Sequence, residues 1–150
     1  EDRQEVLNAL DIHHRPVREI MVAREDVVTV DAAASNDDNL AVLGRERLVR
    51  VPVVRGGFDD VLGVLYVPGV LRHVDELRSG EVRLAELAVS PLTIDADTDI
   101  GDALDRMQRS EQELALLEED GRLVGLVTVT NALEALAGDL RAPYDRPAAR

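Results

Sequence analysis

Two side chains near the end of the sequence offer hydrogen-bonding chemistry at close spacing. Thr128 and Asn131 lie in the stretch GLVTVTNALEAL, in which an apolar run typical of a strand leads into a segment with helical character. A hydroxyl and a carboxamide can each donate and accept hydrogen bonds. The chemistry that this pair offers is therefore hydrogen bonding, at the point where a strand gives way to a helix.

The same pattern occurs 62 positions earlier without these two side chains. The stretch GVLYVPGVLRHV begins on a similar glycine-led apolar run, but Tyr66 and Gly69 occupy the positions of Thr128 and Asn131. Two further pairs of stretches match in the same order, VREIMV with LAELAV and VTVDA with LTIDA. Three ordered matches indicate a tandem repeat of about 65 residues.

Each repeat begins with a short helix-like entry, which leads into a strand and then a helix. A β-branched strand, DVVTVD or PLTID, is followed by a helix-start signal, which is Ser35 with Asp38 in the first copy and Asp97-Thr98-Asp99 in the second. The next segment of the first copy has the weak apolar stripe Leu40 and Leu43. The second copy has a stronger stripe at helical spacing, which consists of Ile100, Ala103, Leu104 and Met107.

Two strands joined by a turn, and then a closing helix, complete each repeat. Gly56-Gly57 and Asp120-Gly121 are residue pairs typical of hairpin turns. The closing helices are expected to end near Arg78 and Leu140. The sequence therefore predicts the element order β-α-β-β-α twice, in a mixed α/β (α+β) fold.

The repeats and their flanks give the predicted domain organisation. Residues 1–16 are expected to form a lead-in helix, and residues 17–79 and 80–140 to form the two pseudo-symmetric repeats. The tail 141–150 has two prolines and no periodicity, so we expect it to be disordered.

The composition is that of a folded chain with a strongly acidic charge balance. Hydrophobic residues make up 45% of the 150 residues and aromatic residues only 2%, so the core must consist of Val, Leu, Ile and Ala. The absence of cysteine excludes disulfides and thiolate metal sites and fits a reducing compartment. A net charge of −13 repels phosphate backbones and anionic lipids, so neither nucleic-acid binding nor membrane-surface binding is expected.

The acid excess has two interpretations. It can simply provide solubility, or it can reflect a halophilic cell with molar internal salt, in which the self-repulsion of the chain is screened. Every basic residue except histidine is arginine, which fits the halophilic interpretation and fits GC-rich coding equally well.

No stretch of the sequence reaches the roughly 18 apolar residues needed to span a bilayer. The longest candidate, VLGVLYVPGVL, is interrupted by Pro68. No signal peptide is visible either. Because the chain begins at Glu1 rather than at a methionine, we expect it to be a fragment of a longer protein whose membrane segments, if present, lie elsewhere.

Taken in order along the chain, these motifs resemble a tandem CBS domain, or CBS pair. The opening VREIMVAREDVVTVD resembles in particular the start of CBS pairs in the CorC/CNNM hemolysin-like membrane proteins. The stretches RVPVV, DDVLGVLYV and GLVTVTNALEALAGDL continue the match in family order. The resemblance covers roughly residues 17–140.

The resemblance implies a regulatory module rather than an enzyme. CBS pairs of this type form two clefts between pseudo-symmetric halves, join into disk-like homodimers, and bind an adenosine nucleotide such as AMP or MgATP. The parent proteins carry a transmembrane domain associated with the transport of magnesium and other divalent cations. This chain is therefore expected to be a cytoplasmic domain of a membrane protein that senses adenosine nucleotide in the cleft of repeat 2. The alternative is a structural dimerisation scaffold whose nucleotide binding has decayed.

The resemblance also assigns candidate nucleotide-binding residues. Thr128 matches the family threonine that helps to hold sugar and phosphate, and Asn131 stands where the family has an aspartate that accepts from both ribose hydroxyls. The amide lacks the formal charge, at an expected cost of about 1–2 kcal/mol in ribose binding. Tyr66 and Gly69 depart further, so the cleft of repeat 1 is expected to be empty or filled by its own side chains.

The remaining candidates are assigned by the resemblance with an alternative for each. Thr93 and Ile94 would line the adenine slot beside Leu114 and Leu116, or all four are ordinary core residues. Arg50 could reach a phosphate, or it pairs with one of the many surface carboxylates. The negative charge of ATP in an acidic domain would require Mg²⁺, arginine contacts or screening by salt.

No other group of residues predicts catalysis or metal binding. The adjacent His13 and His14 diverge on a helix, and the pairs Asp37-Asp38 and Asp59-Asp60 are better explained as helix starts and turns. The run EEDG lacks the spacing of a calcium loop, and no phosphate-binding glycine loop or nucleophile motif is present.

Overall fold

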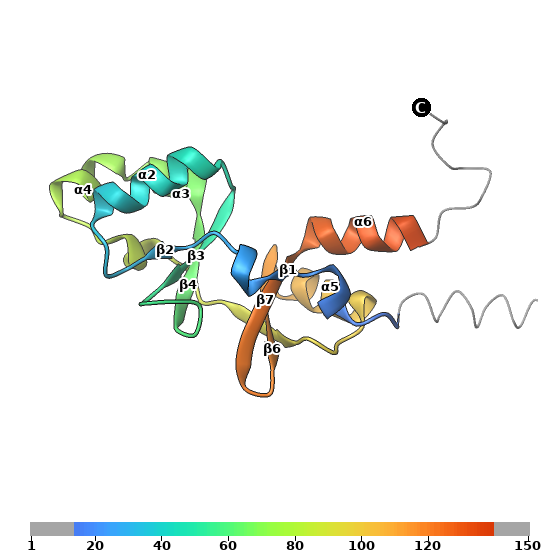
Figure 1. The fold of residues 1–150 in the computed structure, drawn as a ribbon. Helices are drawn as coiled ribbons and strands as arrows, with labels where there is room; N and C mark the ends of the chain where they lie inside the picture. The colour runs from blue at the N-terminus through green and yellow to red at the C-terminus, as the bar shows by residue number, and fades with distance from the viewer. Residues whose placement is uncertain (1–13, 140–150) are drawn as a thin grey trace, which may run out of the picture. The chain divides into compact units, whose positions relative to one another are not determined.

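The computed structural model describes residues 14–139, which form two compact units (Figure 1). Unit 2 is the continuous segment Arg24–Pro91, whereas unit 1 combines residues 14–23 with residues 92–139. The predicted lead-in helix lies outside the described residues except for 14–16, which form a turn and a bridge residue. The predicted disordered tail lies outside them entirely.

Unit 2 contains a three-stranded sheet with its helices. The strands follow the order β2-β3-β4, with β2 parallel and β4 antiparallel to β3. In chain order the elements are η2 (Arg24–Asp26), β2 (Val30–Asp31), α2 (Asn36–Glu46), β3 (Arg50–Val54), β4 (Val61–Tyr66), α3 (Val67–Leu71), α4 (Val74–Ser79) and η3 (Leu84–Leu87).

Unit 1 contains a four-stranded sheet in the order β1-β7-β6-β5. Its β5 runs parallel to β6, and its β7 runs antiparallel to both β6 and β1. The elements are η1 (Val17–Ile20), β1 (Val22–Ala23), β5 (Leu92–Asp95), α5 (Ile100–Arg109), β6 (Leu114–Glu119), β7 (Arg122–Thr128) and α6 (Val129–Asp139). The predicted β-α-β-β-α order is thus confirmed in both units, although the last helix of unit 2 is split into α3 and α4.

The apolar stripes predicted from the sequence explain how α5 and α2 pack. All four stripe residues of α5 are buried in the core of unit 1. On α2, Leu43 is buried and Leu40 partly buried, and the weak stripe is completed by a polar residue that the sequence did not reveal. Asn39 is 3% exposed, and its carboxamide accepts from the N–H of Asp31 at 3.2 Å and donates to the C=O of Asp31 at 2.8 Å. A polar residue is tolerated there because its hydrogen-bonding groups are satisfied.

The helix-start signals act in different ways in the two units. The Ser35 hydroxyl accepts from the N–H of Asp38 at 3.0 Å, as expected for an N-cap. Asp99 occupies the N-cap position of α5 but makes no side-chain cap hydrogen bond within the described chain. Its carboxylate lies 2.7 Å from Nδ1 of His14 instead. The predicted start of α5 is therefore confirmed, but the carboxylate of Asp99 bonds to His14 rather than to the first turn of the helix.

The turn between β6 and β7 has the geometry that its residues predict. Asp120 (φ 53°) and Gly121 (φ 78°) both lie in the left-handed region, as a two-residue hairpin turn of type I′ requires. The β3–β4 connection is longer, spanning residues 55–60, and Gly56 has φ 82° there.

The opening segment of each repeat, residues 17–23 in the first and 84–89 in the second, pairs with the sheet of the other repeat. In unit 1, Val22 of β1 pairs with Leu126 of β7. In unit 2, Val89 forms the corresponding antiparallel bridge with Val64 of β4, with N–H to C=O distances of 2.9 and 3.0 Å. The limits of the compact units therefore differ from those of the sequence repeats.

The pairing of each opening segment with the other repeat explains why both matched stretches begin with glycine. A Cβ atom on Gly63 would lie 2.7 Å from the carbonyl oxygen of Val89 and 2.8 Å from Cβ of Ala88. A Cβ atom on Gly125 would meet the carbonyl oxygen of Val22 and Sδ of Met21 in the same way. The backbone of each opening segment can approach only a residue that has no side chain.

None of the helices within residues 14–139 combines the length and the apolar character needed to cross a bilayer.

We predict that Gly63→Ala lowers the stability of the chain by about 1–3 kcal/mol, because the methyl group displaces the carbonyl of Val89. Gly44→Ala, inside α2, is the matched control, since a Cβ atom there would meet nothing within 4 Å in the described chain. It should raise stability by about 0.5–1 kcal/mol. Urea denaturation followed by circular dichroism measures both changes. Equal stability of the two variants would show that the close approach is not a constraint.

Candidate functional site

One face of the unit 1 sheet gathers four of the predicted site residues. The register pairs Leu114 with Thr128 and Thr93 with Leu116. Because paired residues on neighbouring strands project to the same side, and residues two apart along a strand share a face, these four side chains lie on one face of the sheet. They meet at the end where β7 passes into α6. Leu114 and Leu116 are buried, Thr128 is partly buried and Thr93 is exposed.

Ile94 lies on the opposite face of the sheet. Its side chain is 1% exposed and packs in the core with Ala103 and Met107 of α5. Successive strand residues point to opposite faces, so Thr93 and Ile94 cannot line the same slot with their side chains. The alternative given by the sequence, a core position, describes Ile94.

Thr128 and Asn131 are joined by reciprocal hydrogen bonds at the start of α6. The Thr128 hydroxyl donates to Oδ1 of Asn131 at 2.8 Å and accepts from the Asn131 N–H at 3.1 Å. Thr128 thereby acts as the N-cap of α6, and the side chain of Asn131, three residues later, accepts from its hydroxyl. The two side chains that the sequence selected for ligand binding are thus held in position by each other.

The cap leaves hydrogen-bonding capacity for a ligand. The single hydroxyl hydrogen of Thr128 is used, so this oxygen can only accept a further bond. The amide nitrogen of Asn131 makes no hydrogen bond within the part of the chain that the structure describes, so it can donate. Ribose hydroxyls can both donate and accept, and they fit this donor and acceptor set. The residues present are therefore compatible with the sugar of a nucleotide.

The corresponding step in unit 2 has a different surface. Tyr66 precedes α3 without capping it, and its side chain is 48% exposed. The Arg50 guanidinium lies 5.1 Å from the centroid of the Tyr66 ring, a cation–π contact that the sequence did not predict. Gly69 contributes no side chain, and its carbonyl lies 3.1 Å from Nδ1 of His73. Arg50 belongs to unit 2, whereas the other six candidates belong to unit 1.

An ion-pair cluster at the opposite end of the unit 1 strands was not predicted from the sequence. Arg18 of η1 donates to the carboxylates of Asp97 and Glu119, the latter at 2.8 Å. Hydrogen bonding to Asp97 and then to Glu119 raises the pKa of Arg18 above its ordinary value. The charge pattern along the chain gave no signal for this cluster, because the partners are distant in sequence.

No group of three or more metal-ligating side chains occurs among residues 14–139. Asp59, one of the paired aspartates in the sequence, bonds to Arg24 at 2.8 Å instead. His13 lies outside the described residues.

Comparisons with known proteins agree on one family. The CBS domain family matches residues 84–138. Hemolysin C of Brachyspira hyodysenteriae is 30% identical over 96% of this chain and 53% of its own length. The CBS domain of a bacterial CNNM/CorC family Mg²⁺ transporter, solved in complex with ATP, is 28% identical, with a TM-score of 0.79, and the match covers 91% of this chain and 97% of that one. A CBS domain from Clostridium difficile 630 has a TM-score of 0.78 at 28% identity, covering 87% and 99% of the two chains.

The chain is a CBS-pair domain of the CorC/CNNM hemolysin-like family. As a CBS-pair domain it is a non-enzymatic module, as the sequence predicted. The chain spans about half the length of the hemolysin C relative. The mixed α/β fold with two sheets is the CBS-pair fold.

In this CBS-pair domain, Thr128→Ala should lower stability by about 0.5–2 kcal/mol, because the N–H of Asn131 loses its acceptor at the start of α6. Thr130→Ala, two residues along the same helix and exposed, is the matched control and should change stability little. Thermal unfolding followed by calorimetry measures both variants. Equal losses in the two would show that the Thr128 hydroxyl does not cap α6.

Proposed function

We propose that this CBS-pair domain is a regulatory module that binds an adenosine nucleotide at the sheet face of unit 1 that ends in Thr128 and Asn131. The observation that carries the proposal is the position of this pair, at the junction of a strand and a helix and beside Leu114. Apolar side chains there suit a base, and the free capacity of the pair suits a ribose. A relative of the same fold was solved in complex with ATP.

The charge of the domain determines how such a ligand must bind. A net charge of −13 opposes the approach of a triphosphate, so we propose that ATP binds as its Mg²⁺ complex or in salt that screens the repulsion. The N-terminus of α6 adds a favourable partial charge for an anionic group near Thr128. AMP carries less charge and is the natural comparison.

We propose further that the domain regulates an attached transmembrane domain as part of a homodimer on the cytoplasmic side of the membrane. The relatives include a protein named as a CNNM/CorC family Mg²⁺ transporter. Unit 2 exposes the apolar side chains of Leu48, Val49 and Leu71 around a groove of about 440 Å³, which supports a contact with a second copy. A nucleotide can shift the arrangement of such an assembly only by binding one arrangement better than another.

A second function, a dimerisation scaffold without nucleotide binding, is supported by the same pair of residues. Thr128 and Asn131 satisfy each other in the helix cap and have a structural reason to be present without any ligand. Asn131 also lacks the charge that the family aspartate brings to ribose. The two functions differ in one measurable property, the binding of nucleotide.

Isothermal titration calorimetry of the chain with AMP, ADP and MgATP, in dilute and in molar KCl, tests the proposal. We expect saturable binding of at least one nucleotide. Asn131→Asp should tighten it about tenfold, because a carboxylate can keep the bond from the Thr128 hydroxyl and accept from the ribose as well. Thr128→Phe should abolish binding, since the ring would occupy the ligand position.

The control for both variants is Thr130→Ala, which should bind as the unmodified chain does. Absence of heat and of a thermal shift at millimolar nucleotide would favour the scaffold. Weaker binding by a correctly folded Asn131→Asp variant would contradict the ribose assignment while leaving nucleotide binding itself in place.

A further inference from the structure

Unit 2 contains a polar cavity that is separate from the end of the sheet occupied by Tyr66. The cavity has a volume of about 340 Å³ and lies beyond the C-terminal end of β3, whereas Tyr66 ends the antiparallel strand β4. It is lined by Ala32, Ala34, Asn36, Asn39, Arg55, Gly80, Arg83, Leu84 and Ala85. Among these described residues the lining contains two arginines and no acidic side chain.

The two units correspond residue by residue at this place. The N–H of Ala32 donates to the C=O of Val54 at 2.8 Å, and the N–H of Ala96 donates to the C=O of Glu118 at the same distance. Arg55, which follows Val54, therefore corresponds to Glu119. The matched bridges of Val89 and Val22 likewise make Ala85 the counterpart of Arg18.

In unit 1 the corresponding space is filled by the chain itself. The N–H of Val17 donates to the C=O of Thr98 at 2.7 Å, and the N–H of Arg18 donates to the C=O of Ala96 at 3.1 Å. The Arg18 side chain then bonds to the carboxylates of Asp97 and Glu119. This end of unit 1 is closed by a cation held between two anions.

In unit 2 the closing groups are absent and the charge is reversed. Within the described residues, the N–H groups of Leu84 and Ala85 donate no hydrogen bonds that correspond to those of Val17 and Arg18. Alanine replaces the arginine at position 85, and Arg55 stands where unit 1 has a carboxylate. The cavity is the space left open by these replacements.

The two arginines are the groups available to a ligand. Within residues 14–139, neither Arg55 nor Arg83 forms an ion pair through its guanidinium group. The amides of the lining are already engaged, since Asn39 bonds to the backbone of Asp31 and Nδ2 of Asn36 donates to the carbonyls of Leu77 and Val82. The carboxylate oxygens of Asp31 accept from the N–H groups of Ala33 and Gly56.

We propose that this cavity binds a phosphate group, either as the free ion or as part of a small phosphate ester. Two planar guanidinium groups from different segments can each present a pair of donors to one oxyanion, and a phosphate has enough oxygens to accept from both. The volume exceeds that of a single phosphate and leaves room for a small organic remainder. The site lies outside the nucleotide site proposed in unit 1 and does not depend on it.

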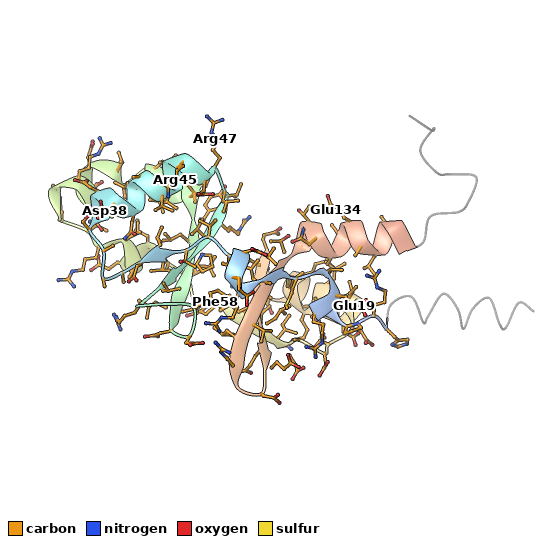
Figure 2. The ribbon with its side chains drawn as sticks, in the orientation of Figure 1. Glu19, Asp38, Arg45, Arg47, Phe58 and Glu134 are labelled. Carbon is orange, nitrogen blue, oxygen red and sulfur yellow. The ribbon has the colours of Figure 1, made fainter. Side chains whose placement is uncertain are left out.

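Nearby acidic residues lower the affinity that we expect for phosphate. The first turn of α2 carries Asp37 and Asp38, and Figure 2 shows Asp38 on this helix. Their charges oppose an anion, so the affinity should lie in the millimolar range. Binding should be strongest for an ion that engages both arginines at once.

The test is a ¹H–¹⁵N NMR titration of the chain with inorganic phosphate at constant ionic strength, with chloride as the balancing anion. We expect saturable shifts at Ala32, Ala34 and Ala85 and at the Nε–H groups of Arg55 and Arg83. Arg55→Gln and Arg83→Gln should each weaken binding about tenfold. Arg72→Gln, which removes the same charge from an exposed position of unit 2, should have little effect.

A triple variant, Ala33→Asp with Arg55→Glu and Ala85→Arg, rebuilds the ion pairs of unit 1 in unit 2. It should lose phosphate binding while keeping a cooperative unfolding transition. A parallel titration with glycerol 3-phosphate distinguishes the two sources of the phosphate. Tighter binding than inorganic phosphate indicates an ester as the ligand, and equal binding indicates the free ion.

Absence of saturable shifts, or equal weakening by Arg55→Gln and Arg72→Gln, would overturn the proposal. Because the titrations contain no nucleotide, failure here leaves the proposed function of unit 1 untouched, and failure of nucleotide binding leaves this site untouched.

Discussion

The close contact between each opening segment and the sheet of the other repeat is the constraint on which both units depend. Val22 pairs with β7 and Val89 with β4. Their backbones come so close to these strands that a side chain at Gly125 or Gly63 would collide with them. Because the segments are exchanged, neither repeat completes its own unit. The repeat seen in the sequence is thus a unit of duplication, while the compact unit contains pieces of both copies.

A shared backbone allows the two units to differ in chemistry at both ends of their strands. Where β7 meets α6, Thr128 and Asn131 keep hydrogen-bonding groups, whereas Tyr66 in unit 2 lies under Arg50. At the other end of the strands the open unit is unit 2 instead of unit 1. Arg18 closes unit 1 between two carboxylates, whereas unit 2 is open and lined by arginine. Each unit therefore presents one end that is available and one that is engaged by its own side chains.

The acidic composition gives these local differences their importance. In a chain with a net charge of −13, Arg55 and Arg83 stand out because they line one cavity whose lining residues include no acidic side chain. Some other arginines form ion pairs, such as Arg24 with Asp59 and Arg109 with Asp105, whereas Arg47, Arg72, Arg78 and Arg106 form none within the described residues. Exposed pairs of this kind contribute little stability individually, but they neutralise cations that would otherwise attract anions. An anionic ligand in this domain therefore depends on a place where unpaired guanidinium groups lie together, as Arg55 and Arg83 do at this cavity.

Local patterns in the sequence were sufficient to predict the repeat, the order of the elements and the residues at the strand-to-helix step. Periodicity predicted the buried face of α5, and local signals predicted the Ser35 cap and the Asp120-Gly121 turn, because these depend on neighbours within a few residues. The sequence did not reveal the buried Asn39. Its partners are backbone groups eight residues away, brought close only by packing.

The folded chain was needed to see which elements share a unit and which side chains share a face. It separated Ile94 from Thr93, because the strand register fixes the side of the sheet to which each residue points. It also brought Arg55 and Arg83 to one cavity, and joined Arg18 to Glu119 across 101 positions. Contacts between distant segments depend on the pairing of strands and on the exchange of the opening segments, and no local pattern in the sequence specifies them.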